Sequence, residues 1–171
     1  MTSFARLRVA LQPLAATAIV LAASVVSLAS AWTIQALGFQ PCELCLLQRY
    51  PFYAALPLGA AAIFLARNAP PLAARIVLGL IAAGFVAGAV LAAYHAGVEW
   101  KIWPGPAGCT GAFAAPTSMA AFRAQLESVH VVRCDEAALR ILGLSMAGWN
   151  VPVSGAIALI AALGATAPKK A

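Results

Sequence analysis

Long apolar blocks, separated by short polar stretches, set the pattern of this chain. Four blocks are long enough to cross a bilayer as helices, which takes about 20 residues each. Within each block apolar residues follow one another almost continuously, without the three-to-four residue alternation of an amphipathic surface helix. The pattern predicts four membrane-spanning helices, at residues roughly 13–37, 46–66, 76–95 and 151–167.

Composition supports the same reading. The chain of 171 residues is 63% hydrophobic and only 9% charged, whereas soluble domains carry about 25% charged residues. A soluble helical protein with a large apolar core is the alternative, and the continuous blocks argue against it. The net charge of +6 comes without a basic patch interleaved with aromatic residues, so no nucleic acid partner is expected. We expect one all-α integral membrane domain over residues 1–171.

The first block resembles a secretory signal in two respects. Arg6 and Arg8 precede it, and Ala29-Ser30-Ala31 resembles a cleavage site. A signal core usually has about 7–15 apolar residues, however, and this run is longer. We therefore expect a retained helix.

Charges in the connections predict the orientation. Four spans place both termini on one side, where six basic residues and no acid fall: Arg6, Arg8, Arg67, Arg75, Lys169 and Lys170. The other side holds five basic residues and all five acids, which are Glu43, Glu99, Glu127, Asp135 and Glu136. We expect cytoplasmic termini, with outward loops at roughly 38–45 and 96–150.

The long outward loop contains two candidate helices. One covers residues 116–129, and Asp135 is a candidate N-cap for the other, at residues 136–146. The second is interpreted either as a helix lying on the membrane surface or as an ordinary packed loop helix. Its apolar stripe consists of Leu139, Leu142 and Met146.

All four cysteines fall in the outward loops, where an oxidising compartment lets disulfides persist. Cys42 and Cys45 form a C-x-x-C pair. Such pairs have depressed thiol pKa values and reducible bridges. Cys109 and Cys134 stand 25 residues apart and can close a large loop.

Three other readings of the cysteines remain. Two structural disulfides suit Cys109 and Cys134, but a C-x-x-C bridge braces little chain. A four-cysteine zinc site favours short spacings in both halves, which the second pair lacks. Haem attachment requires His after the second cysteine, and residue 46 is Leu. A redox role for Cys42 and Cys45 is favoured, and no metal is expected.

Arg49 and His95 are the candidate polar partners of the pair. If the second span begins near Cys45, the helix dipole favours negative charge on that thiol. Arg49, four residues on, would share its helical face and support a thiolate or the oxyanion of a lipid-soluble acceptor; the alternative is an arginine reaching to the headgroups. His95 ends the third span as an interfacial residue or a proton carrier.

Three segments together resemble one family. They are PCELCLLQRY after the first span, YHAGVEWKIWPGPAGC after the third, and RCDEAALRILGLSMAGWN before the fourth. With four spans, they resemble the DsbB family of bacterial membrane disulfide-bond formation proteins over essentially the whole chain. The resemblance implies a four-helix bundle in the bacterial inner membrane, with a long periplasmic loop. It also implies electron transfer from a periplasmic DsbA-like thiol oxidase to ubiquinone or menaquinone.

The resemblance also implies roles for single residues. The partner's thiolate would attack Cys109 of a Cys109–Cys134 bridge, and Cys134 would then exchange with Cys42. Cys45 would be released as a thiolate in charge-transfer contact with the quinone. Arg49 matches the arginine that supports the quinone, and His95 matches a histidine near it. Many members carry an acid where this chain has Gln48. The alternatives are an oxidase dedicated to one specialised partner, and a non-catalytic scaffold with structural disulfides.

Overall fold

A computed structural model describes residues 12–106, 118–120, 123 and 133–167. Four helices in it are long and apolar enough to cross a membrane, as the apolar blocks predict, and the all-α fold class is confirmed. In chain order the elements are α2 (Pro13–Ala36), α3 (Glu43–Leu47), α4 (Tyr50–Asn68), α5 (Pro71–Glu99), β1 (Arg140–Ile141), β2 (Leu144–Ser145) and α7 (Met146–Ala165). Cys109 and most of residues 116–129 lie outside the described residues.

Prolines set several helix boundaries. Pro13, Pro51 and Pro71 lie in the first turns of α2, α4 and α5, where a residue without an N–H costs no hydrogen bond. Pro51 also separates α3 from α4, because it has no N–H to donate to the carbonyl of Leu47. The second span therefore consists of a short helix, a turn at residues 48–49 and a long helix.

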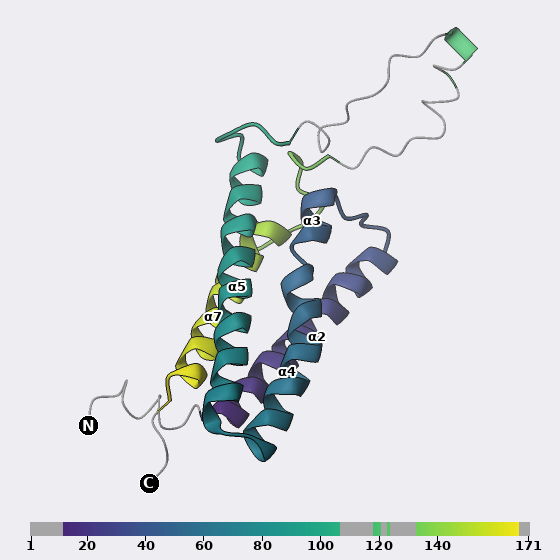
Figure 1. The fold of residues 1–171 in the computed structure, drawn as a ribbon. Helices are drawn as coiled ribbons and strands as arrows, with labels where there is room; N and C mark the ends of the chain where they lie inside the picture. Colours follow the sequence, from purple (N-terminus) through teal and green to yellow (C-terminus); the bar gives the residue numbers. More distant parts are fainter. Residues whose placement is uncertain (1–11, 107–117, 121–122, 124–132, 168–171) are drawn as a thin grey trace.

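The four long helices pack side by side around one apolar core (Figure 1). Helix α5 packs most extensively against α7, and α4 packs against both α2 and α5. The rings of Phe52 and Phe85 meet edge to face, with centroids 5.0 Å apart. The core cluster consists of Val20, Leu28, Phe52, Ala55, Leu78, Ile81, Ala82, Phe85, Ile157, Ala158 and Ala161.

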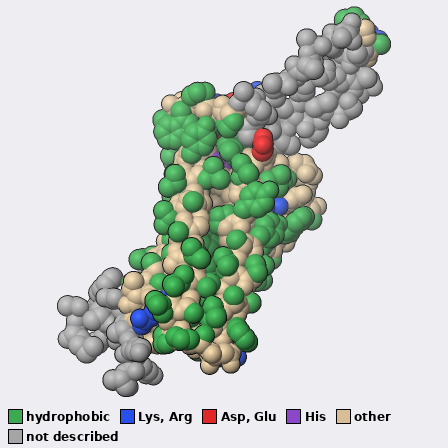
Figure 2. Space-filling view, viewed as in Figure 1, with side chains coloured by type: hydrophobic (Ala, Val, Ile, Leu, Met, Phe, Trp, Pro, Cys, Tyr) green, Lys and Arg blue, Asp and Glu red, His purple; other side chains and the backbone are tan. Residues whose placement is uncertain are grey.

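Apolar side chains also cover the outside of the bundle. Val26, Phe64 and Val90 are each about two-thirds exposed, and Figure 2 shows hydrophobic side chains along the visible flank of the helices. A soluble protein rarely exposes an apolar surface this extensive. The outer face of the bundle is therefore suited to lipid, and the chain is a multi-pass membrane protein.

The two ends of the bundle differ. The start of α2, the α4–α5 connection and the end of α7 lie together at one end (Figure 1). Arg67 and Arg75 belong to this end, and the Arg75 guanidinium donates a hydrogen bond to the carbonyl of Ala167. Helix α3, the end of α5 and the start of α7 lie at the other end, which we call the α3 end. The candidate site residues gather there.

The helix expected at residues 136–146 is wrong. The chain instead forms an antiparallel hairpin in which Arg140 pairs with Ser145 and Ile141 with Leu144. Leu142 and Gly143 both have positive φ, at 51° and 84°, as a two-residue hairpin turn requires.

Hydrogen bonds around the hairpin explain its form. The Asp135 carboxylate binds Lys101 and Arg133, so it does not cap a helix. The Ser145 hydroxyl caps α7 by accepting the N–H of Gly148 at 3.0 Å, which starts the last helix at Met146. The indole of Trp149 donates to the Ile141 carbonyl at 2.9 Å and ties the hairpin to α7.

Helix α5 ends in a turn that folds back on the helix. Lys101 has φ 59°, and the N–H of Ile102 reaches the Gly97 carbonyl at 2.9 Å, the pattern of a Schellman C-cap. The next turn brings Trp103 onto Gly97, where its indole donates to the Tyr94 carbonyl at 2.8 Å. The Tyr94 and Trp103 rings stack with centroids 5.9 Å apart. The start of the long loop is therefore held in place.

We expect Gly97→Ala to loosen this turn. An added Cβ would overlap the Trp103 ring, so the ring must move, at a cost of about 1–3 kcal/mol. Thermal unfolding in detergent measures the loss. Gly84→Ala is the matched control in the same helix, because no atom lies within 4 Å of its added Cβ. Equal stability of the two variants would contradict the proposed packing.

Candidate functional site: a thiol pair beside a polar pocket

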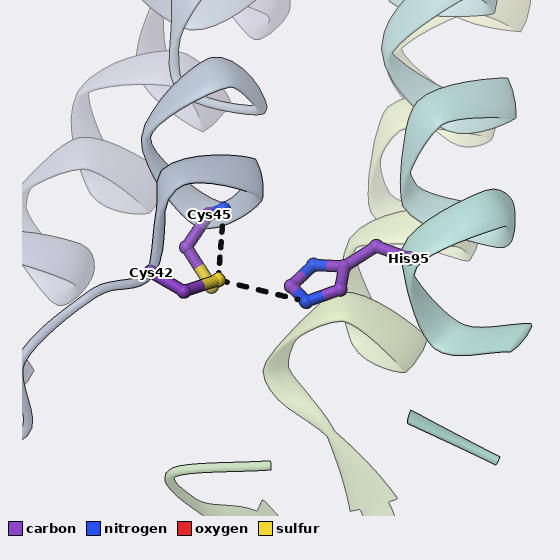
Figure 3. Close-up of side chains that lie close together, drawn as sticks. All are labelled: Cys42, Cys45 and His95. Atoms are coloured by element: carbon purple, nitrogen blue, oxygen red, sulfur yellow. Dashed lines mark hydrogen bonds between the residues drawn. The ribbon is translucent and has the colours of Figure 1, made fainter. Parts of the chain in front are cut away.

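Cys42 and Cys45 form a reduced pair at the start of α3. Both carry free thiols, and their sulfur atoms lie 3.2 Å apart. Cys42 is the N-cap of α3, and its sulfur accepts the backbone N–H of Cys45 at 3.4 Å. Figure 3 shows both side chains directed toward the His95 ring. A disulfide needs only a shortening of the sulfur distance to about 2.0 Å.

The N-terminus of α3 lies at both thiols. Helix α3 begins three residues before the expected span, with Cys42 as its N-cap and Cys45 in its first turn, where the helix dipole favours negative charge. The hydrogen bond from the Cys45 thiol lowers the pKa of Cys42; burial opposes this, and the nearby His95 ring adds to it. The contacts around Cys42 therefore favour its thiolate form.

His95 is part of the site and is not an interfacial residue. Only 1% of its surface is exposed. Its Nε2 lies 3.6 Å from the Cys42 sulfur and 3.1 Å from the carbonyl oxygen of Cys134. Helix α5 thus places an imidazole between the thiol pair and the segment that carries Cys134.

Cys134 lies next to the pair. It is fully buried and packs in one cluster with Cys42 and Leu44, and it is disulfide-bonded. That bond excludes Cys134 as a thiolate ligand, so the four-cysteine zinc site does not fit. The ligand atoms of Cys42, Cys45 and His95 lie within 4.8 Å of one another, which is close enough for a thiophilic ion and equally for thiol exchange. The pairing of Cys134 with Cys109 stays a prediction, because Cys109 lies outside the described residues.

Arg49 lies in the turn between α3 and α4, where its backbone stays in the right-handed helical region, and it lines the same cavity as Cys45. Its Nη1 donates to the Gln35 side chain at 2.9 Å. The guanidinium also lies 5.6 Å from the centre of the Trp32 ring, a cation–π distance. Two residues of α2 therefore hold Arg49 at the edge of the site.

A cavity of about 320 Å³ opens beside the thiols, within the range of small-molecule sites. Val26, Leu28 and Ile34 of α2 contribute an apolar wall. The polar lining includes Cys45, Gln48, Arg49, His95, Glu99 and Asn150, and the charged residues Arg133 and Glu136 also reach the cavity.

Sequence reasoning gave no role to several polar residues around this cavity. Gln48, Ser154 and Glu99 are all buried. Oε1 of Glu99 lies 3.8 Å from His95 Nε2, and its Oε2 has no hydrogen-bond partner among the described residues. Two features of the sequence could have pointed to these residues. Gln48 lies inside an apolar block, and Asn150 and Ser154 lie four residues apart on one helix. The packing that joins them was not available from the sequence.

A membrane-embedded helical bundle that holds a thiol pair beside a cavity with apolar and polar walls is suited to a membrane thiol oxidoreductase. Comparison with known families agrees: residues 13–164 match the family described as Disulfide bond formation protein DsbB. The chain belongs to the DsbB family, and is therefore a membrane oxidase of disulfide formation.

One relative is the uncharacterized protein RP370 of Rickettsia prowazekii (strain Madrid E), which is 24% identical over 131 residues. That alignment covers 75% of this chain and 73% of the relative. No solved structure matches the chain.

Proposed function

We propose that this protein oxidises the dithiol of a periplasmic DsbA-like thiol oxidase and passes the electrons to a membrane quinone. The overall reaction is partner dithiol plus quinone giving partner disulfide plus quinol, so two electrons and two protons move together. The observation that carries the proposal is the position of Cys42. Cys42 packs in one buried cluster with Cys134 and also lines the cavity together with Cys45.

One cysteine pair would react with the soluble partner and the other with the quinone. The pair Cys109–Cys134 belongs to the long loop and receives electrons from the soluble partner. The Cys134 thiolate that this leaves attacks Cys42 of a Cys42–Cys45 disulfide, which forms a Cys134–Cys42 bond and releases Cys45 as a thiolate. Once the partner has left as a disulfide, the Cys109 thiolate attacks Cys134, which restores the Cys109–Cys134 bond and releases Cys42 as a thiolate. The Cys42–Cys45 pair then holds the two electrons beside the cavity, and each step is a thiolate attack on a disulfide.

The residues around the cavity fit a quinone. Its head group supplies the two-electron sink when bound. The apolar wall from α2 suits the ring and tail, and Arg49, His95 and the free oxygen of Glu99 provide polar contacts. Ubiquinone and menaquinone both meet this description. Arg49 would orient the head group and stabilise negative charge on its oxygen, and Cys45 would lie beside it.

The orientation follows from the same proposal. The α3 end faces the periplasm, where a soluble thiol partner is available, and both termini face the cytoplasm of a bacterial cell. Arg67 and Arg75 then lie on the cytoplasmic side, in agreement with the positive-inside rule.

The test is a complete reaction with the full chain purified in detergent. Reduced thioredoxin-fold partner and ubiquinone or menaquinone are supplied, and partner thiols and quinone absorbance are followed together. We expect equal amounts of partner disulfide and quinol. A comparison of several partners separates a general oxidase from a dedicated one. Absence of quinone consumption with every partner and quinone would leave the scaffold with structural disulfides as the better account.

We expect Arg49→Ala to raise the KM for quinone about 10- to 100-fold, the effect of losing a hydrogen bond from a charged group. The KM for the reduced partner should change little, because Arg49 lies on the cavity side of the pair. Steady-state rates at varied quinone and at varied partner measure the two constants. Arg67→Ala, at the other end of the bundle, is the matched control. An unchanged quinone KM would count against a quinone contact for Arg49.

A further inference from the structure

A chain of hydrogen bonds crosses the bundle behind the thiol pair. The Ser154 hydroxyl bonds Asn150 Oδ1 at 3.0 Å, and Asn150 Nδ2 bonds Gln48 Oε1 at 2.8 Å. Gln48 Nε2 then reaches His95 Nδ1 at 2.8 Å. The chain joins α7, the α3–α4 turn and α5, and ends on the imidazole beside Cys42.

The His95 ring, at the end of this series of hydrogen bonds, decides which group donates in each bond. The acceptor nearest His95 Nε2 is the Cys134 carbonyl oxygen, at 3.1 Å. A carbonyl can only accept, so Nε2 carries a hydrogen. In a neutral ring Nδ1 is then bare and must accept, which makes Gln48 the donor. The amide oxygen of Gln48 faces Asn150 as a consequence, and each later group has its donor and acceptor in the matching place.

We propose that Gln48 and Asn150 are positioning residues that hold His95 as a neutral ring with its hydrogen on Nε2, directed at the Cys42 sulfur and the Cys134 carbonyl. Ser154 completes the chain by fixing the Asn150 amide. An amide at position 48 can donate to Nδ1, whereas a carboxylate there could only accept from it.

The arrangement has a chemical consequence at Cys42. The Nε2–H of a neutral His95 can donate to the Cys42 sulfur and so favours the Cys42 thiolate. Unlike a protonated ring, it adds no second charge to the buried site. Three further groups face the ring: the Cys45 thiol beyond Cys42, the Glu99 carboxylate at 3.8 Å and the Cys134 carbonyl. When Cys134 takes part in exchange and its carbonyl shifts, the Nε2 hydrogen is left for the Cys42 sulfur. This consequence for turnover rests on the proposed function, while the hydrogen position does not.

The hydrogen position can be measured directly. The full chain is labelled with ¹⁵N-histidine and studied in detergent micelles at about pH 8, where an ordinary imidazole is neutral. His130→Gln identifies the signals of the other histidine. We expect a bare Nδ1 and a protonated Nε2 for His95. A hydrogen on Nδ1 in the wild-type chain overturns the proposal without any variant of the network.

Two substitutions should move the hydrogen. In Gln48→Glu the new carboxylate can only accept, so Nδ1 becomes protonated. In Asn150→Asp the carboxylate turns the Gln48 amide around, and Gln48 Oε1 then accepts from Nδ1. Ser24→Ala is the matched control, because Ser24 is a fully buried serine of α2 whose hydroxyl has no hydrogen-bond partner among the residues that the structure describes. A bare Nδ1 in both acidic variants overturns the assigned direction.

Turnover gives the second readout. We expect Gln48→Glu and Asn150→Asp to shift the pH profile of quinone reduction and to lower turnover about tenfold, the effect of one altered hydrogen bond, while Ser24→Ala keeps the wild-type profile. Unchanged profiles in variants whose hydrogen has moved overturn the positioning role. If the wild-type chain shows the expected hydrogen but reduces no quinone, the proposed function fails and the assignment of the hydrogen stands.

Discussion

Cys45→Ser is expected to abolish quinone reduction, with a loss of at least about 10³-fold, as for removal of a covalent nucleophile. Serine is close to cysteine in size but cannot form the Cys42–Cys45 disulfide. Without that bond no electron pair can be delivered on the cavity side. The loop pair should still be able to exchange with the reduced partner once, so a single turnover of partner thiols is retained.

The measurement is steady-state quinone absorbance together with a single-turnover count of partner thiols. Cys45→Ser should fold normally, because the Cys45 side chain is only partly buried and lies outside the Phe52–Phe85 core. Thermal unfolding checks this point, with Ser24→Ala as a second small change inside the bundle. Continued quinone reduction by a folded Cys45→Ser protein would contradict the proposed electron path.

Cys134→Ser is expected to cause a similarly large loss with a protein partner. Cys134 is disulfide-bonded, and its replacement leaves no oxidised loop pair for the partner to attack. The pair Cys42–Cys45 keeps its position beside the cavity, because the N-cap of α3 and His95 do not depend on the Cys134 sulfur. Quinone reduction by a small dithiol that reaches the Cys42–Cys45 pair directly should therefore survive.

Two electron donors separate these effects. Reduced thioredoxin-fold partner and a small dithiol are compared at equal quinone concentration for the wild type, Cys134→Ser and Cys109→Ser. We expect both variants to fail with the protein partner and to work with the small dithiol. Full activity of both variants with the protein partner would show that the loop cysteines are not on the path.

The fold was largely predictable because membrane helices need long apolar runs, and few other structures tolerate them. The hairpin at residues 140–145 was not predicted, because its apolar positions also match a helical pattern. Leu139, Leu142 and Met146 suit one helical stripe, yet Gly143 follows Leu142 directly and allows a tight turn. Local periodicity could not include the contact between Asp135 and Lys101, which lies 34 residues earlier in the chain.

The sequence indicated part of the candidate site. It pointed to the Cys42–Cys45 pair and to Arg49 and His95 as partners, and the structure brings the two thiols and His95 together. The redox role of the pair stays a prediction. The roles of Gln48 and Asn150 depend on which helices are neighbours, and a single polar residue in an apolar block does not reveal its partner. Helix α3 begins at Glu43 with Cys42 as its N-cap, three residues before the expected span, and sequence patterns place such boundaries poorly.

The two ends of the long loop meet at the α3 end. Lys101 leaves the cap of α5, and its ammonium reaches the Asp135 carboxylate at 2.5 Å, next to the buried Cys134. An ion pair with so exposed a lysine adds little stability, but with the Trp103 turn and the buried cysteine it closes the loop at its base. Changes of length between these anchors would therefore leave the sulfur of residue 134 where it is. Related chains could exchange this insert to suit different soluble partners while keeping the same membrane machinery.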